Sequence, residues 1–420
     1  MSESLNTLGI WLGGDGTWSS TFPLLMVHLN IVIYALCFWM QQPVLPFLSK
    51  ELGVDGQGFG MLQSFVSAFA LIGGPVIGRL TDQFGPKLTL IISQAGSVAM
   101  YSLLSIATSA PLLFASRVPS IAQHAMLASQ AAVSVLSSTD KRSSALGKLS
   151  LSYGIGMVLG SPLGGTISEH VGYRYAAMIS TVFSVLILVL DALFFPEMKA
   201  KSETIDKKED GLNLSKIFEL LLVASVRDLL LTTTAVFIGL GSFRTVFSLA
   251  AEPIYGLNSQ DLGYFMSFGA IVGLVTNVFL VARLISFFGS NINALVGAAF
   301  CLSICYVGYS FTSTYSEIMA VSIPVGIFST LLYTVSGALM SLVVEKGDAG
   351  TAIALSHASR SFTGIVSPII GGKVFDEFGI DGACWFAAGC CMIAAAFASI
   401  VSRSISKENI TSSSSEKKQL

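Results

Sequence analysis

The chain has 420 residues, of which 53% are hydrophobic and only 11% are charged. Soluble domains carry about a quarter charged residues, so this composition excludes an ordinary water-soluble protein and a disordered one. The formal net charge is −2, so no basic excess points to a nucleic-acid partner. We therefore expect an integral membrane protein whose surroundings are the lipid bilayer.

The start of the chain and the cysteines give no sign of a cleaved signal peptide, a metal site or a disulfide framework. The first 21 residues contain no Lys or Arg, so we expect no cleaved signal peptide and interpret the first apolar run as a retained span. The six cysteines lie in or beside apolar runs, without the paired spacing of a zinc site or a disulfide framework. We expect reduced packing residues, no metal and no cofactor.

Twelve apolar runs are long enough to cross a bilayer, because about 20 apolar residues suffice for a helix. Only helices or closed barrels satisfy the backbone in lipid, and these runs are too long for barrel strands. The expected fold is therefore an all-α membrane protein of twelve transmembrane helices. The runs cover residues 22–46, 59–80, 88–107, 111–136, 146–167, 173–195, 229–251, 262–282, 291–311, 316–343, 351–374 and 382–402.

The longest polar stretch lies between the sixth and seventh runs and separates two halves of six helices. It ends in a short amphipathic piece, which we expect to be helical. The expected parts are an N-terminal tail (1–21), an N-terminal six-helix bundle (22–195), a cytoplasmic linker (196–228), a C-terminal six-helix bundle (229–402) and a C-terminal tail (403–420).

The distribution of basic residues predicts the orientation. With both termini in the cytoplasm, seventeen of the 23 Lys and Arg residues lie in inside segments and three in outside segments. The remaining three, Arg117, Arg244 and Arg360, fall within spans. Cytoplasmic loops carry the excess of Lys and Arg in membrane proteins, so both termini are expected inside.

The two halves contain an internal repeat. GRLTDQFG (78–85) matches ARLISFFG (282–289), and GGTISEHVG (164–172) matches GGKVFDEFG (371–379), at offsets of 204 and 207. Each offset spans six helices, an even number, so the copies share one topology. Parallel repeats of this kind are related by an axis along the membrane normal, an architecture that suits alternating access.

The segment GRLTDQFGPK (78–87) joins the second and third spans on the inside. Its glycines allow a tight turn, and its carboxylate can sit on a facing helix N-terminus. A solvated loop is the alternative interpretation. The segment resembles the cytoplasmic signature of the major facilitator superfamily, with Gln83 where that signature usually has a basic residue. The residues that match are Gly78, Asp82, Gly85 and Lys87.

The fifth span has a glycine pattern similar to that of the superfamily's drug antiporters, with its proline one residue late. The second half has SPIIGG (367–372), with proline in the expected register. This pattern predicts a hinge that lets the bundles slide, and small-residue helix packing is the alternative. The hinge candidates are Gly147, Gly156, Gly160, Pro162, Gly164, Gly165 and Pro368.

The resemblance covers nearly the whole chain and is nearest to the twelve-span drug:proton antiporters and the organic-cation-transporter-like proteins. Four segments carry the narrower likeness: MQQPVLPFLSKELG (40–53), GGPVIGRLTDQ (73–83), LLFASRVP (112–119) and SALGKL (144–149). It implies two pseudo-symmetric bundles that rock around a central site. It also implies that Asp82 latches onto the N-terminal end of span eleven, near Gly350 and Thr351.

Ionisable groups within spans are costly, so each needs an explanation. Arg117 resembles the fourth-span arginine tied to proton coupling in the drug antiporters. His124 lies seven residues later, and a continuous helix would place both on one face. A structural arginine bonded to carbonyls is the alternative. Because His titrates near neutral pH, the proton-coupling candidates are Arg117, His124 and His357.

Other polar residues are candidates for lining a substrate cavity. Arg244 and Glu252 are eight residues apart on one helix face, which predicts a buried pair. Asp191, near the inner end of span six, is interpreted as an interfacial carboxylate. The cavity candidates are His28, Trp39, Gln42, Gln123, Arg244 and Arg360.

Together with the resemblance, which implies organic cations or drugs as substrates, these features predict a secondary active transporter, not an enzyme. It would export small amphipathic organic solutes by alternating access and be driven by a proton gradient. Three arginines within spans would instead favour anions if they face the cavity unpaired. A nutrient uniporter or symporter and a non-transporting receptor or scaffold are the alternatives. We expect a monomer in the plasma membrane or an endomembrane. The terminal KKQL (417–420) resembles an endoplasmic-reticulum retrieval signal.

Overall fold

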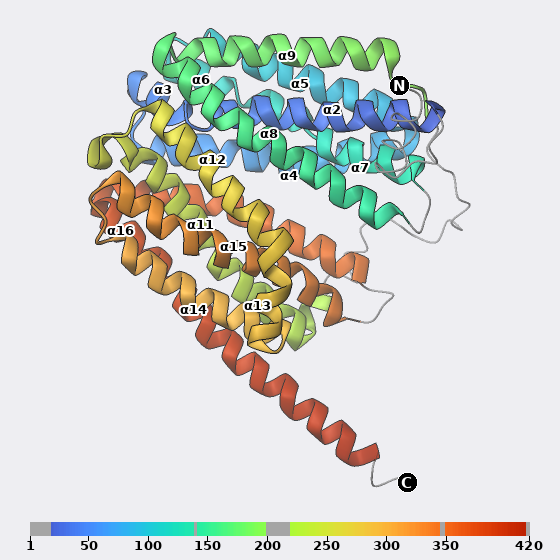
Figure 1. Ribbon diagram of the computed structural model, residues 1–420, viewed down its shortest axis with the longest axis vertical. Helices are drawn as coiled ribbons and strands as arrows, with labels where there is room; N and C mark the ends of the chain where they lie inside the picture. Colours follow the sequence, from blue (N-terminus) through green and yellow to red (C-terminus); the bar gives the residue numbers. More distant parts are fainter. Residues whose placement is uncertain (1–17, 138–140, 199–218, 345–348, 417–420) are drawn as a thin grey trace. The chain divides into compact units, whose positions relative to one another are not determined.

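The computed structural model describes residues 18–137, 141–198, 219–344 and 349–416, and all regular structure within these ranges is helical (Figure 1). All twelve expected spans fall in helical segments. The described residues contain nine helices long and apolar enough to cross a membrane. The difference has three causes: span four is broken, span five is rich in Gly and Ser, and spans eleven and twelve run together.

In the first half, spans one to six consist of nine helical segments. These are α2 (Trp18–Gln41), α3 (Leu45–Glu51), α4 (Gly56–Phe84), α5 (Pro86–Ser105), α6 (Ala110–Ala115), the 3₁₀ helix η1 (Val118–Ala122), α7 (Ala125–Leu136), α8 (Arg142–His170) and α9 (Tyr173–Phe194).

In the second half, span eight contains a π-helical turn, and spans eleven and twelve are two helices that meet at Gly379, within the range labelled α16. The backbone of Gly379 is not helical, and its φ of +65° suits glycine. The elements are α11 (Ala224–Tyr255), α12 (Ser259–Val275), the π-helix η2 (Thr276–Leu280), α13 (Val281–Phe288), α14 (Asn291–Tyr309), α15 (Tyr315–Leu342) and α16 (Ala349–Glu416).

The structure corrects the prediction of a continuous helix in span four. α6, η1 and α7 replace it, so Arg117 and His124 do not share the face of one helix. Pro119 lies in η1 and lacks the N–H that a continuing α-helix needs. Neighbouring helices bond the backbone groups that the break releases: the Tyr34 hydroxyl donates to the Gln123 carbonyl (3.2 Å).

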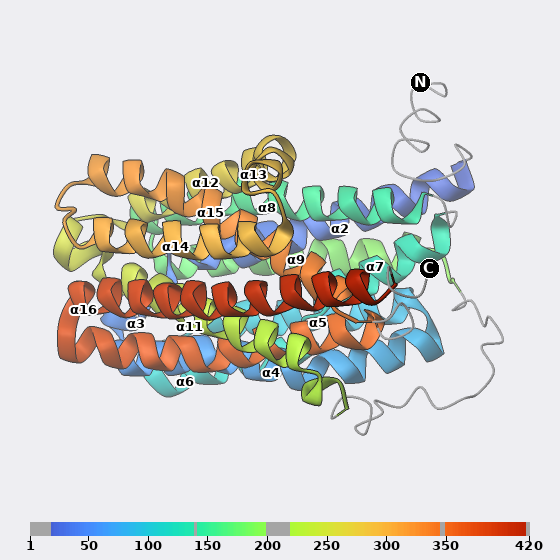
Figure 2. The same cartoon turned by 90° about the horizontal axis from the view of Figure 1, so that it is seen from below.

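Two compact units divide the chain, and each is described by itself. Unit 1 contains residues 1–206 and 256–270, and unit 2 contains residues 207–255 and 271–420. The first part of α12 therefore belongs to unit 1, although the sequence places span eight in the C-terminal half. Within unit 1, α2 packs along α8 (Figure 2) and α5 packs along α9 (Figure 1).

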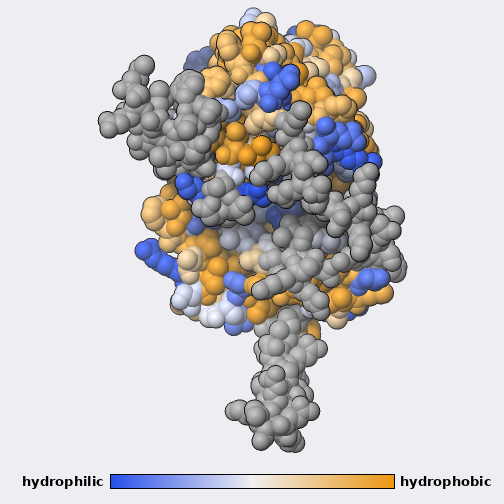
Figure 3. Space-filling model, turned by 90° about the vertical axis from the view of Figure 1, so that its right-hand side faces the viewer, coloured by the Kyte–Doolittle hydropathy of each residue, from blue (hydrophilic) through white to orange (hydrophobic). Residues whose placement is uncertain are grey.

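Large apolar side chains are exposed on the outer faces of the helices, as expected of a surface in contact with lipid. On α9, Val182, Leu186 and Leu193 are 65%, 50% and 69% exposed. Figure 3 shows broad hydrophobic patches interrupted by hydrophilic groups. Such surfaces are rare on soluble proteins, and lipid tails remove the cost of exposing them.

The start of α4 depends on one cap. The Asp55 carboxylate accepts a hydrogen bond from the Gly58 N–H (2.7 Å), one of the donors that the first turn leaves without a helical partner. We expect Asp55→Ala to lower the free energy of unfolding by about 1 kcal/mol. Thermal unfolding of the purified protein measures this. Asp55→Asn keeps an acceptor and should lose less; an equal loss would contradict the capping role.

Candidate functional site

The core of unit 1 contains a buried arginine that lacks a hydrogen-bond partner at two of its nitrogens within the described part of the chain. Arg117 lies between α6 and η1 and is only 2% exposed. Its Nε and Nη2 atoms have no hydrogen-bond partner among the residues that the structure describes. A small cavity touches the side chain and is also lined by Gln41, Gln42 and Gln63. A buried charge that is not compensated by the protein is suited to bind an anion or to respond to a proton.

Unused hydrogen-bonding groups surround this arginine. The Gln41 amide donates to the Ser180 hydroxyl (2.8 Å), while its Oε1 atom has no partner within the described part of the chain. The hydroxyl of Tyr101, which is fully buried, is also without one. Tyr101 lies close enough to Arg117 to interact with it electrostatically. The site thus offers donors and acceptors to a polar ligand or water.

The predicted cavity residues of the first half divide between this core and the α2–α8 contact. The Gln123 amide donates to the Ser97 hydroxyl (3.1 Å) on α5. His28 is buried, and its Nδ1 atom is 2.8 Å from the Ser152 hydroxyl of α8. The Trp39 indole donates to the Tyr153 hydroxyl (3.2 Å) of α8. Of the residues predicted in span one, Gln42 alone borders the cavity at Arg117.

His124 lies at the end of the break in span four and packs against α4. A Cβ atom added at Gly73 would lie 2.8 Å from the His124 Nε2 atom, so α4 approaches the ring closely because Gly73 has no side chain. That Nε2 atom has no partner among the described residues. His124 and Arg117 therefore belong to one broken span but contact different surroundings.

In unit 2, Arg360 packs against aromatic rings. Its guanidinium lies 5.0 Å from the ring centre of Tyr333 and 6.0 Å from that of Phe237, and it donates to the Ser356 hydroxyl (3.2 Å). These are cation–π contacts. His357 is exposed.

The structure corrects the predicted burial of the Arg244–Glu252 pair. Both side chains are exposed, so neither is a charge hidden in the core of unit 2.

The glycines of α8 allow close contacts with two different helices. Cβ atoms added at Gly156, Gly160 and Gly164 would collide with the backbone of α2, whereas one added at Gly165 would collide with α12 near Ser259. Gly147 faces open space. Four of the hinge candidates are therefore packing positions within unit 1, and their part in sliding stays a prediction.

The contact between α8 and the first part of α12 combines close packing with polar bonds. The Ser267 hydroxyl donates to the Val158 carbonyl (2.7 Å), and the Ser259 hydroxyl lies 3.2 Å from both the Gly165 carbonyl and the Glu169 carboxylate. A Cβ atom at Gly263 would lie 3.1 Å from the Ser161 carbonyl carbon. This contact explains why residues 256–270 belong to unit 1.

We expect Gly263→Leu to open the α8–α12 contact, because overpacking costs about 1–3 kcal/mol. A Ser267→Cys probe, in a protein without its native cysteines, should then react with a maleimide about tenfold faster, since 1.4 kcal/mol corresponds to tenfold. Gly269→Leu is the matched control, because nothing lies within 4 Å of that position. Equal labelling rates in the two variants would show that Gly263 does not hold the contact.

The predicted latch residues lie at the junction of α4 and α5. Asp82 is exposed in the last turn of α4, Gly85 has a φ of +84° between the helices, and Lys87 lies in the first turn of α5. Gly78 faces open space. The proposed acceptors Gly350 and Thr351 belong to unit 2, so the latch itself stays a prediction.

One polar cluster was not found in the sequence. Asp191, interpreted as an interfacial carboxylate, is fully buried within unit 1, and its depth in the membrane stays a prediction. It accepts a hydrogen bond from Asn30, which in turn accepts one from Gln94. The signal that was overlooked is that all three are polar residues within apolar runs of spans one, three and six. The predicted amphipathic helix of the linker and the KKQL tail lie largely or wholly outside the described residues.

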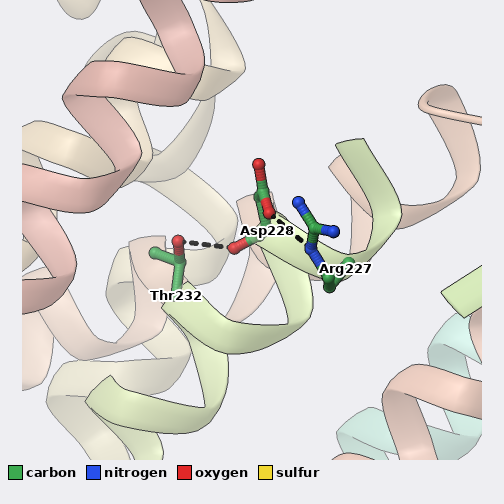
Figure 4. A network of polar contacts seen from close by, with 3 residues as sticks. All are labelled: Arg227, Asp228 and Thr232. Atoms are coloured by element: carbon green, nitrogen blue, oxygen red, sulfur yellow. Dashed lines mark hydrogen bonds and ion pairs between the residues drawn. The ribbon is translucent and has the colours of Figure 1, made fainter. Parts of the chain in front are cut away.

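The start of α11 provides a contrast with the buried site. Arg227 is exposed, and its Nε atom is 3.0 Å from the carboxylate of its neighbour Asp228 (Figure 4). The Thr232 hydroxyl donates to the Asp228 carbonyl (2.8 Å). Arg227 therefore has both solvent and a counter-ion, whereas Arg117 is buried and forms no ion pair with the described residues.

Comparisons with known proteins agree with this architecture. The chain is 30% identical to solute carrier family 22 member 18 of Mus musculus, over 84% of this chain and 90% of that protein. It is 26% identical to multidrug resistance protein 1 of Bacillus subtilis (strain 168), with the same shares covered. The solved structure of the nucleoside transporter NupG is similar in fold, with a TM-score of 0.75 at 12% identity, covering 90% of this chain and 98% of that one.

The human organic anion transporter MFSD10 is similar too, with a TM-score of 0.66 at 15% identity, covering 89% of this chain and 98% of that one. At such identities the two solved structures show the fold alone. The family model of the Major Facilitator Superfamily matches residues 27–323 and 279–419. The protein is an integral, multi-pass membrane transporter with a twelve-helix fold, and not an enzyme. The chain belongs to the major facilitator superfamily.

Proposed function

We propose that this transporter is a proton-coupled antiporter that exports small amphipathic organic solutes by alternating access. The observation that carries the proposal is Arg117, which is buried beside a cavity and whose Nε and Nη2 atoms find no hydrogen-bond partner in the described ranges. A fixed positive charge in a membrane protein costs free energy unless something compensates it. A transporter can recover that cost only in the states in which a solute or a change in protonation provides the compensation. This requirement couples the two events.

The names of relatives support the solute class. One is a multidrug resistance protein, and Staphylococcus aureus has a quinolone resistance protein, NorA, that is 23% identical over 84% of this chain. The charge of the solute follows from the site. Unpartnered nitrogens favour a solute with a carboxylate or another anionic group, whereas the glutamines of the cavity accept neutral polar groups as well.

A flux assay in proteoliposomes tests the proposal. An outward- or inward-directed pH gradient is imposed, and ethidium as an organic cation or benzoate as an organic anion is added while internal pH is recorded. We expect substrate-driven proton movement, and its loss in His124→Ala would assign proton transfer to His124. Uptake that ignores the gradient would establish a uniporter. No uptake, together with no thermal stabilisation by either probe, would favour a receptor or scaffold.

We further propose that both termini face the cytoplasm and that the protein acts as a monomer. The excess of Lys and Arg in the segments on that side supports the orientation. A protease site placed before residue 18 should be cut only from the cytoplasmic side of sealed vesicles. Cleavage from the other side would show that the N-terminus faces away from the cytoplasm. The proposed orientation would then be wrong.

A further inference from the structure

A carboxyl group lies in the core of unit 1, away from Arg117. Asp191 on α9, Asn30 on α2 and Gln94 on α5 are each 0% exposed. The Asn30 amide donates to the Asp191 Oδ2 atom (2.5 Å), and the Gln94 amide donates to the Asn30 Oδ1 atom (2.6 Å). The side chains of three helices are thus joined through one asparagine whose donor and acceptor are both used.

Two acceptor atoms of the network receive no hydrogen bond from the described residues. The Asp191 Oδ1 atom and the Gln94 Oε1 atom have no hydrogen-bond partner in the described residues. Apolar side chains of one hydrophobic cluster flank the network along each helix, among them Val27, Leu90 and Phe195. An ionised carboxylate offers acceptors only, whereas a protonated one has an O–H donor. Protonation of Asp191 at Oδ1 would therefore give the polar network an additional hydrogen-bond donor. It would also remove an isolated buried charge.

Among the described residues, no basic group forms an ion pair with Asp191. Of the helices packed against α9, α5 carries Lys87, whose charge reaches Asp191 without forming an ion pair among the described residues. On α2, His28 turns to the Ser152 hydroxyl, and on α8 Lys148 acts on His28. The carboxyl is thus free to exchange a proton without breaking a salt bridge.

One face of α5 connects this carboxyl to the arginine site. Gln94, Ser97 and Tyr101 follow one another at helical spacings of three and four, so they lie on one face, and all three are buried. Ser97 accepts a hydrogen bond from Gln123, and Tyr101 interacts with Arg117. A line of polar side chains therefore runs through the core of unit 1 from Asp191 toward Arg117.

We propose that Asp191 is a proton-binding site of this transporter, with Asn30 and Gln94 as positioning residues and the polar face of α5 as its link to Arg117. The proton comes from water on one side, bonds to Oδ1 and returns to water on the other side, so the site is regenerated in each cycle. The claim that Asp191 carries protons during transport rests on the proposed antiport. The claim that Asp191 binds a proton does not depend on antiport.

Infrared difference spectroscopy of the full-length protein in lipid, between acidic and alkaline pH, tests the proton site without any substrate. We expect a carbonyl band of a buried carboxylic acid that appears with acidification and is absent in Asp191→Asn. Glu51→Gln, which removes an exposed carboxylate 3.9 Å from Arg174, is the matched control and should keep the band. A band that persists in Asp191→Asn, or no titrating band in the wild type, would overturn the proposal.

The variant is suited to transport measurements because an asparagine at 191 resembles the protonated acid. It keeps an acceptor for Asn30 and carries no charge, so the thermal unfolding midpoint should be unchanged or higher. We expect gradient-driven accumulation of the transported probe to fall to the level measured without a gradient, while exchange of labelled for unlabelled probe continues. Accumulation at the wild-type level would overturn the role in coupling. A wild type that moves no protons would contradict the proposed antiport, and the infrared band alone would then decide the proton site.

Discussion

Replacing Arg117 by Met should abolish proton-driven accumulation without destabilising the protein. Coupling free energies of about 1–3 kcal/mol correspond to roughly 5- to 150-fold, so the accumulation ratio should fall by about that factor. Methionine fills much of the same volume and removes a guanidinium with two unpartnered nitrogens. Replacing buried ionic groups by apolar ones is often neutral or stabilising. The free energy of unfolding should therefore equal that of the wild type or exceed it by up to about 2 kcal/mol.

The two measurements separate function from structure. Arg227→Met is the matched control, because Arg227 is exposed and bonded to Asp228; both its flux and its thermal unfolding should match the wild type. A large loss of stability in Arg117→Met would mean that the arginine is a structural strut, the alternative that its sequence left open. A stable variant with unchanged accumulation would remove Arg117 from the coupling mechanism.

The helical fold could be predicted because the bilayer imposes it. Each span needs about 20 apolar residues, and the positions of all twelve runs were found from that requirement alone. Span four was the exception. Its apolar composition is that of a helix, but Pro119 ends the regular hydrogen bonding, and the replacement bonds come from Tyr34 and Ser93 on other helices. Composition within the span does not contain that information.

The site was predicted less completely, for a similar reason. Arg117 stands out because a charged residue in an apolar run is costly wherever it points. Asp191 lies near the end of a run, where burial depends on what the neighbouring helices place beside it. Only the structure shows that Asn30 and Gln94 meet it there. Likewise, the glycines of α8 indicated close contacts, but not that most of them face α2.

Substituting Ala at two glycines of α8 should change stability in opposite directions. At Gly164 the added methyl would lie 2.6 Å from the Met40 Cα and carbonyl carbon atoms, which belong to the backbone of α2 and cannot turn aside. The α2–α8 contact would have to separate, and we expect unfolding to cost about 3 kcal/mol less. At Gly147 the methyl meets nothing within 4 Å, and alanine favours helix by roughly 1 kcal/mol over glycine.

Thermal unfolding and the yield of folded protein should therefore rank Gly147→Ala at or above the wild type and Gly164→Ala well below it. The two positions share one helix and one substitution, so helix propensity is the same in both, and only the contact with α2 distinguishes them. Equal stabilities would mean that α8 does not pack on α2 through its glycines. If Gly147→Ala is stable but transports slowly, Gly147 acts as the predicted hinge, because the contacts leave it no packing role.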